Sequence, residues 1–83
     1  MKILKFQTKT CTPCKMVDMM LKDMGLEVDE VIDIEEQEEV REKYDVMKSP
    51  TIILVDGEGV VQGKVMGIDE EGIKELFKKA GRM

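Results

Sequence analysis

The chain has 83 residues and a formal net charge of −5, from 13 Lys and Arg against 18 Asp and Glu. This length suits one small domain, and the acidic charge disfavours nucleic acid or an anionic membrane as the main partner. Because His is absent, histidine-based catalysis and histidine-ligated metal sites are excluded. No apolar run approaches the roughly 20 residues of a membrane span, and the early lysines do not fit a signal peptide. We therefore expect a monomeric, cytoplasmic protein with a single domain over residues 1–83.

The first part of the chain predicts a strand, a helix and a second strand. Ile3–Phe6 is a short apolar run that fits a strand. Pro13 suits the first turn of a helix, where its missing N–H leaves no bond unmade, and Gly25 suits the end of that helix. Between them, apolar residues recur at helical spacing: Val17, Met20, Leu21 and Met24. The second strand is expected over Val28–Ile34.

The middle of the chain predicts a helix and two strands joined by a tight turn. Glu35–Tyr44 fits a charged helix, for which Asp33 is a candidate cap. Thr51–Val55 is a continuous apolar and β-branched run, typical of a strand that is covered on both faces. Asp56–Gly59 supplies the Asp-Gly pair that a hairpin turn favours, so Val60–Met66 is expected to return antiparallel.

The end of the chain predicts a further helix and completes the fold. Asp69 is the expected N-cap and Gly81 the expected end, with acidic residues in the first turn and lysines in the last to complement the helix dipole. One apolar stripe runs along this helix: Ile73, Leu76, Phe77 and Ala80. Gly63, inside the preceding strand, predicts a bulge or a close backbone approach. The order β-α-β-α-β-β-α predicts an α/β fold with a four-stranded mixed sheet and helices on both faces.

The two cysteines, Cys11 and Cys14, carry the chemistry of this sequence. A close pair in an intracellular chain is more often a redox or metal site than a permanent crosslink. Cys11 stands where a strand ends and a helix begins, so the helix dipole and free backbone N–H groups favour its thiolate. Cys14 follows in the first helical turn, near enough to close a ring with Cys11. The pair predicts dithiol exchange, in which Cys11 attacks a disulfide and Cys14 resolves the mixed disulfide.

With Cys11-Thr12-Pro13-Cys14 at a strand–helix junction, the chain resembles the thioredoxin family. Two further segments carry the resemblance. Tyr44–Thr51 is similar to the Tyr-x-x-x-x-x-Pro-Thr segment of the family, and Gly67 stands where the family has a Gly that lines the substrate groove. The resemblance spans Ile3–Ala80 and implies a thioredoxin-like fold of glutaredoxin size.

The resemblance also implies a function, a protein-disulfide oxidoreductase with a redox-active Cys11–Cys14 disulfide and no bound cofactor. Its partners would be disulfide-containing proteins and a disulfide reductase. Electrons would come from NADPH through a flavin enzyme, or from another dithiol. The peptide bond before Pro50 would be cis, and backbone groups of Ser49 would meet an extended substrate. The substrate groove implied by the resemblance consists of Thr10, Thr12, Pro13, Ser49, Pro50 and Gly67.

Several positions depart from the family pattern. Thr10 stands where a Trp commonly precedes the first Cys, and Thr12 stands where a Gly is common. Ser49 replaces the hydrophobic residue that commonly precedes the cis-proline. Lys5 aligns with the buried Asp that typically assists the second thiol, so the sequence assigns no residue to that proton transfer. It leaves open whether Lys5 takes over the role or lies at the edge of the sheet.

Two other functions remain open at this stage. A glutathione-linked glutaredoxin uses a similar cysteine motif and cis-proline, but usually has a Gly-Gly pair before the last helix, where this chain has Gly67 alone. A soft-metal chaperone would hold Cu(I) or Zn(II) with Cys11 and Cys14, but such domains usually have a Gly-rich loop and end in a strand.

Three lysines and one methionine are expected around the cysteine pair. The lysines are interpreted as solvated residues or as a surface that steers an acidic partner: Lys9, Lys15 and Lys48. Met47 is the candidate apolar contact for a substrate.

Overall fold

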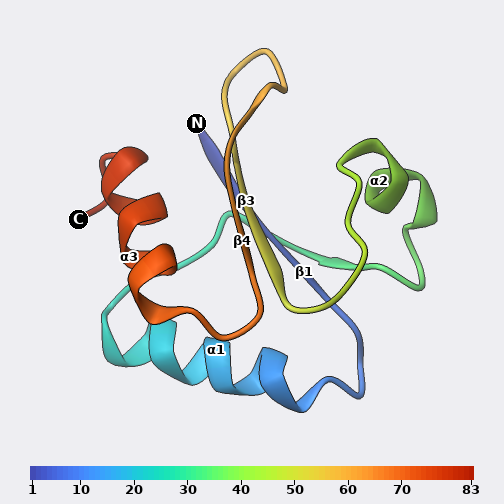
Figure 1. Ribbon diagram of the computed structural model, residues 1–83, viewed down its shortest axis with the longest axis horizontal. Coiled ribbons are helices and arrows are strands. Elements are labelled where there is room, and N and C mark those ends of the chain that lie inside the picture. Colours follow the sequence, from blue (N-terminus) through green and yellow to red (C-terminus); the bar gives the residue numbers. More distant parts are fainter.

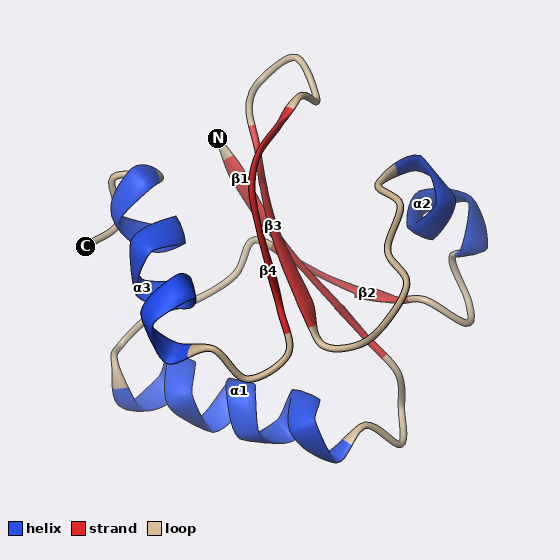
Figure 2. Cartoon of the chain, in the orientation of Figure 1, coloured by secondary structure: helices blue, strands red, loops and turns tan.

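The computed structural model describes residues 1–83 and forms one sheet with three helices around it (Figure 1). The strands lie in the order β2–β1–β3–β4, with β1 parallel to β2, and with β3 antiparallel to both of its neighbours (Figure 2). The elements are β1 (Lys2–Gln7), α1 (Thr12–Asp23), β2 (Glu30–Asp33), α2 (Glu38–Lys43), β3 (Thr51–Val55), β4 (Val61–Met66) and α3 (Glu70–Lys79). The predicted fold class and element order are confirmed. None of the helices has the length and apolarity needed to cross a membrane.

Helices cover both faces of the sheet, as predicted, with α1 and α3 on one face and α2 on the other (Figure 1). Side chains alternate along β1, so Ile3 and Leu4 point to opposite faces. The cluster beneath α1 and α3 consists of Ile3, Val17, Leu21, Leu26, Ile52, Leu54, Val65, Ile73, Leu76 and Phe77. The cluster beneath α2 consists of Leu4, Phe6, Ile32, Val46, Ile53 and Val55, with Ile34, Val40 and Tyr44 packed against it.

β3 is the buried centre of the sheet, and all of its residues are buried. This confirms the strand covered on both faces that its continuous apolar run predicts. In the antiparallel register with β1, Phe6 lies opposite Thr51. The end of β1 and the start of β3 therefore meet at the same edge of the sheet. Cys11 follows β1 and Pro50 precedes β3, so the register between these two strands sets the position of the site.

β2 is shorter than the sequence predicts, because it covers Glu30–Asp33 instead of residues 28–34. Its flanking residues still bond to β1. Asp29 donates its N–H to the carbonyl of Ile3 at 2.8 Å, and Ile34 donates its N–H to the carbonyl of Gln7 at 3.0 Å. The expected pairing is present, and only the regular strand geometry ends earlier.

α2 is also shorter, because it covers Glu38–Lys43 instead of residues 35–44. The Asp33 carboxylate accepts hydrogen bonds from the backbone N–H groups two and three residues later, at 2.9 and 3.4 Å. These bonds hold a turn before the helix, as is common for Asp. Asp33 therefore does not cap α2, and Gln37 occupies the N-cap position without a side-chain hydrogen bond.

The last strand and helix follow the sequence closely. β4 begins at Val61, one residue later than expected, and the irregularity predicted at Gly63 is a register shift beside it. Asp69 is the N-cap of α3, and its carboxylate accepts the N–H of Gly72 at 3.0 Å. A Cβ at Gly72 would lie 2.6 Å from Asp69 Oδ2, so this cap leaves no room for a side chain there.

Asp29 and Arg82 tie the two ends of the chain together. The Asp29 carboxylate accepts the N–H of Ile3 at 2.7 Å and pairs with the Arg82 guanidinium. The same guanidinium donates to the carbonyl of Met1 at 3.2 Å. The hydrogen bond from Arg82 is the main cause that lowers the pKa of Asp29 below its usual 3.8.

Replacing Asp29 by Asn should therefore lower the free energy of unfolding by about 1 kcal/mol at neutral pH, because a partly exposed ion pair is broken and a bond to the N–H of Ile3 is weakened. Since the pKa is lowered in the folded state, this stabilisation is present above the unfolded value near 3.8 and is lost as the pH falls through the lowered value. Urea unfolding of both proteins from neutral to strongly acid pH should show their stabilities converging in acid.

The control is Lys74→Gln, which breaks the pair with Glu70 within α3 and should change stability by about 0.3 kcal/mol. A gap between wild type and Asp29→Asn that stays constant at every pH would contradict the assignment to the Asp29 carboxylate.

Candidate functional site

Cys11 is the N-cap of α1, at the end of the turn that follows β1. Its Sγ accepts the backbone N–H of Cys14 at 3.1 Å, so sulfur takes the place of the oxygen of a usual cap. Pro13 lies in the first turn, where a proline loses no hydrogen bond, and that turn contains no acidic residue. The positive end of the helix therefore faces this sulfur without a competing carboxylate.

Cys11 and Cys14 form a disulfide, with their Cα atoms 5.2 Å apart. Cys11 is 8% exposed and Cys14 is 2% exposed, so Cys11 is the more accessible of the two cysteines. The structure gathers no group of three or more Cys, Asp or Glu side chains that could share a metal ion. The arrangement can carry out reversible disulfide exchange, which needs only these two sulfurs and a partner.

The loop before β3 packs against the disulfide. The Ser49–Pro50 peptide bond is cis, and the Ser49 hydroxyl lies 3.5 Å from Cys11 Sγ, to which it can donate. Pro50 is buried, and its carbonyl accepts the N–H of Gly67 at 2.8 Å. Gly67 has a φ of 75°, a conformation that glycine adopts without strain. Contacts therefore connect four of the expected site residues, although they lie far apart in sequence.

The other expected groove residues are sequence neighbours of the two cysteines and are exposed to solvent. Thr10, Thr12 and Pro13 are all exposed. Met47, the candidate substrate contact, is 74% exposed, and Met66, beside Gly67, is 52% exposed. Both methionine side chains are therefore open to solvent on this side of the protein.

The three lysines expected around the disulfide are exposed, but they are not equivalent. Lys9 forms an ion pair with Glu36, at 2.5 Å from Nζ to Oε1. The hydrogen bond from Glu36 is the main cause that raises the pKa of Lys9 above its usual 10.5. The charge of Lys9 is thus partly offset by its own neighbour. Lys15 and Lys48 form no ion pair, so the steering interpretation applies to them best.

Lys5 is a contact of the site that the sequence did not assign. It is 0% exposed, and it belongs to β1, which has a neighbour on each side, so it does not lie at the edge of the sheet. Its Nζ donates to the carbonyl of Cys14 at 3.2 Å and to Asp18 Oδ1 at 2.6 Å. The sequence does contain a signal for this burial. Side chains alternate along β1, so Lys5 points to the same face of the sheet as Ile3, and α1 packs on that face.

Three comparisons with known proteins agree with this geometry. A family model described as a thioredoxin domain matches residues 1–78. A prophage-derived thioredoxin-like protein of Bacillus subtilis, YosR, is 29% identical over 79 residues, which cover 95% of this chain and 98% of that protein. The thioredoxin of the same organism is 36% identical over 80 residues, which cover 89% of this chain and 76% of that one. The solved structure of the Drosophila melanogaster thioredoxin Deadhead has a TM-score of 0.78 at 26% identity, over 93% of this chain and 77% of that chain.

The contact between Ser49 and Cys11 makes a prediction about the reduced protein. Replacing Ser49 by Ala removes a donor to sulfur, so the Cys11 thiolate should be less stable and alkylation by iodoacetamide should slow about threefold at neutral pH. The rate is measured as loss of free thiol over time. Thr12→Ala is the matched control, since it removes an exposed hydroxyl that has no hydrogen bond to either sulfur. Equal slowing in both variants would contradict a specific role for Ser49.

Proposed function

The chain belongs to the thioredoxin family and is a thiol-disulfide oxidoreductase, and we propose that it reduces protein disulfides with the two electrons of the Cys11–Cys14 dithiol. The observation that carries the proposal is the disulfide at the N-terminus of α1, in contact with the loop before β3. A thiolate at a helix N-terminus is stabilised by the dipole and is the attacking species in exchange. No bound cofactor is needed, because both electrons reside in the sulfur pair.

Exchange proceeds in two displacements. The Cys11 thiolate attacks one sulfur of the substrate disulfide, so that a Cys11–substrate bond forms, the substrate bond breaks and the departing sulfur takes up a proton. Cys14 then loses its proton, and its thiolate attacks Cys11 Sγ. The Cys11–Cys14 bond forms, the mixed disulfide breaks and the second substrate thiol leaves. The substrate gains two electrons and two protons, and the protein is left as the disulfide described above.

The assignment of Cys11 as the attacking residue rests on its surroundings. It has the larger exposed fraction of the two cysteines, 8% against 2%. Its sulfur also has two potential donors, the backbone N–H of Cys14 and the hydroxyl of Ser49. Cys14 lies beneath it, suited to the internal second step. Hydrogen bonds and a helix terminus both favour the charged form of a thiol.

The substrate groove is proposed to run between the first turn of α1 and the loop before β3. Thr10, Thr12 and Pro13 line one side, and Ser49, Pro50 and Gly67 line the other. An extended peptide would pair with the backbone of Ser49, as strands pair at an open sheet edge, while its apolar side chain meets Met47. The exposure of Met47 supports this contact.

The oxidised protein must be returned to the dithiol by another electron donor. We propose a flavin disulfide reductase that draws on NADPH, or a second dithiol protein, as the source. A monomer in the cytoplasm suits this role, because thiol pools there are kept reduced.

Insulin-disulfide reduction in dithiothreitol tests the proposal. The wild-type protein should accelerate the reaction, and Cys11→Ser should reduce the rate to that of dithiothreitol alone, because no nucleophile remains. Cys14→Ser is the matched variant, since it keeps the first displacement and blocks the second. Once it has been reduced and freed of dithiothreitol, it should accumulate a mixed disulfide with insulin, detected by mass spectrometry.

Turnover by Cys11→Ser equal to that of wild type would contradict the mechanism. Support of turnover by glutathione and glutathione reductase alone, with no response to a flavin reductase that acts on protein dithiols, would instead identify a glutaredoxin-like enzyme.

A further inference from the structure

A buried ammonium lies against the residue that resolves the mixed disulfide. Lys5 has no exposed surface, and its Nζ is bonded to Gln7 Oε1 at 2.6 Å, the carbonyl of Cys14 at 3.2 Å and Asp18 Oδ1 at 2.6 Å. An ammonium has three N–H donors, so each of them has an acceptor here. The charge is therefore held in one place, beside the first two turns of α1.

Packing alone does not explain a charge at this position. The register partners of Lys5 are Val31 in β2 and Ile52 in β3, and neither is charged. Burying an ammonium is unfavourable unless its partners compensate, and an apolar side chain of similar volume is often as stable or more so. A fixed charge acts on nearby groups that change their own charge. Among the residues that Lys5 contacts, two carry such a group: Asp18, through its carboxylate, and Cys14, whose carbonyl accepts the bond from Nζ and whose side chain is a thiol.

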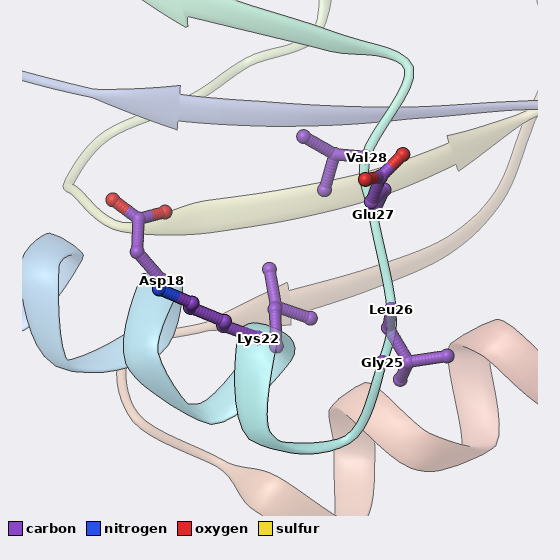
Figure 3. Close-up of a pocket in the computed structure, with 7 residues that line it drawn as sticks. Asp18, Lys22, Gly25, Leu26, Glu27 and Val28 are labelled. Carbon is purple, nitrogen blue, oxygen red and sulfur yellow. The ribbon is translucent and has the colours of Figure 1, made fainter.

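Asp18 lies on the solvent side of this pair. Its side chain is 56% exposed, while that of Lys5 is 0% exposed. It lines an open hollow of about 540 Å³, together with Lys22 and Glu27, along the second half of α1 (Figure 3). Water screens an exposed carboxylate more than a buried ammonium. The pair therefore has a buried positive end, which donates to the Cys14 carbonyl, and a negative end in contact with water, so that water screens the negative charge more than the positive one.

We propose that Lys5 is a positioning residue whose buried charge stabilises the Cys14 thiolate in the resolving step, with Asp18 as the counter-charge that moderates it. The inference rests on the proposed function, because it concerns the second displacement of that reaction. The Cys14 thiol releases its proton to water, its thiolate bonds to Cys11 Sγ, and the Cys11–substrate bond breaks. The departing substrate sulfur takes up a proton, and Lys5 stays charged throughout.

Titration of the Cys14 thiol in a Cys11→Ser background tests the proposal, since only one thiol then ionises. Thiolate formation is followed by ultraviolet absorbance as the pH rises. Lys5→Met keeps the volume and removes the charge, so the midpoint should move up by about one pH unit. Asp18→Asn leaves the Lys5 charge unopposed, so the midpoint should move down, by less, because Asp18 is half-exposed.

The two opposite shifts separate an electrostatic role from a structural one. If Lys5 only ties β1 to α1, both variants change the urea midpoint and leave the thiol titration where it was, and that result overturns the proposal. Shifts in the same direction overturn it as well. Should Lys5→Met fail to fold, Asp18→Asn decides alone: a downward shift supports the proposal and an unchanged midpoint overturns it.

The surface pair of Lys2 and Glu30, with side chains 64% and 53% exposed, provides matched controls. Lys2→Met and Glu30→Gln should leave the midpoint unchanged, and shifts as large as those at Lys5 overturn the assignment.

A second readout uses the native cysteines. Loss of the stabilising charge should make the Lys5→Met dithiol more reducing, by up to about tenfold in its equilibrium with dithiothreitol, or about 30 mV for two electrons. These titrations need no protein substrate. Failure of wild type to reduce insulin would therefore contradict the proposed function alone, while unshifted titrations in an active protein would contradict the role of Lys5 alone.

Discussion

The antiparallel pairing of β1 with β3 is the constraint on which the site depends. Because Phe6 lies opposite Thr51, the strand that leads to Cys11 ends at the edge where the loop with Pro50 enters the sheet. A one-residue slip of this register would turn every side chain of one strand to the opposite face. It would bury Lys5 and Ile3 under α2 and separate Ser49 from Cys11. The apolar clusters on both faces hold the register, so the core also fixes the chemistry at its edge.

The first turn of α1 converts that placement into reactivity. Its N-cap is a sulfur instead of an oxygen, so the group that satisfies the helix N-terminus is also the sulfur proposed to attack the substrate. The helix dipole favours a negative charge at Cys11, while the buried Lys5 ammonium donates to the carbonyl of Cys14, the residue on whose thiol its charge is proposed to act. In this proposal, electrostatic support reaches the two sulfurs from different elements, α1 for the first and β1 for the second.

Much of this structure follows from local sequence signals, and the rest depends on contacts between distant residues. The cysteine pair at a strand–helix junction, the covered run of β3 and the Asp69 cap could be predicted, because each depends on a few neighbouring residues. α2 was predicted too long, since the Asp33 carboxylate bonds the backbone that would have formed its first turn. The partner of Lys5 could not be predicted, because it depends on how α1 crosses the sheet. The Asp29–Arg82 pair joins residues 53 apart in sequence, and no pattern marks it. The roles of Cys11 and Cys14 in exchange stay predictions, to which the structure adds geometry.

The central claim is that Cys11 and Cys14 interconvert between dithiol and disulfide within one folded chain. Equilibration in dithiothreitol buffers of graded potential, followed by alkylation and mass spectrometry of the folded protein, measures this directly. The account predicts one two-electron transition in which both cysteines become alkylated together, reversibly and independently of protein concentration. A pair that is reduced only after unfolding, or that oxidises into disulfide-linked dimers in place of the internal bond, would contradict it.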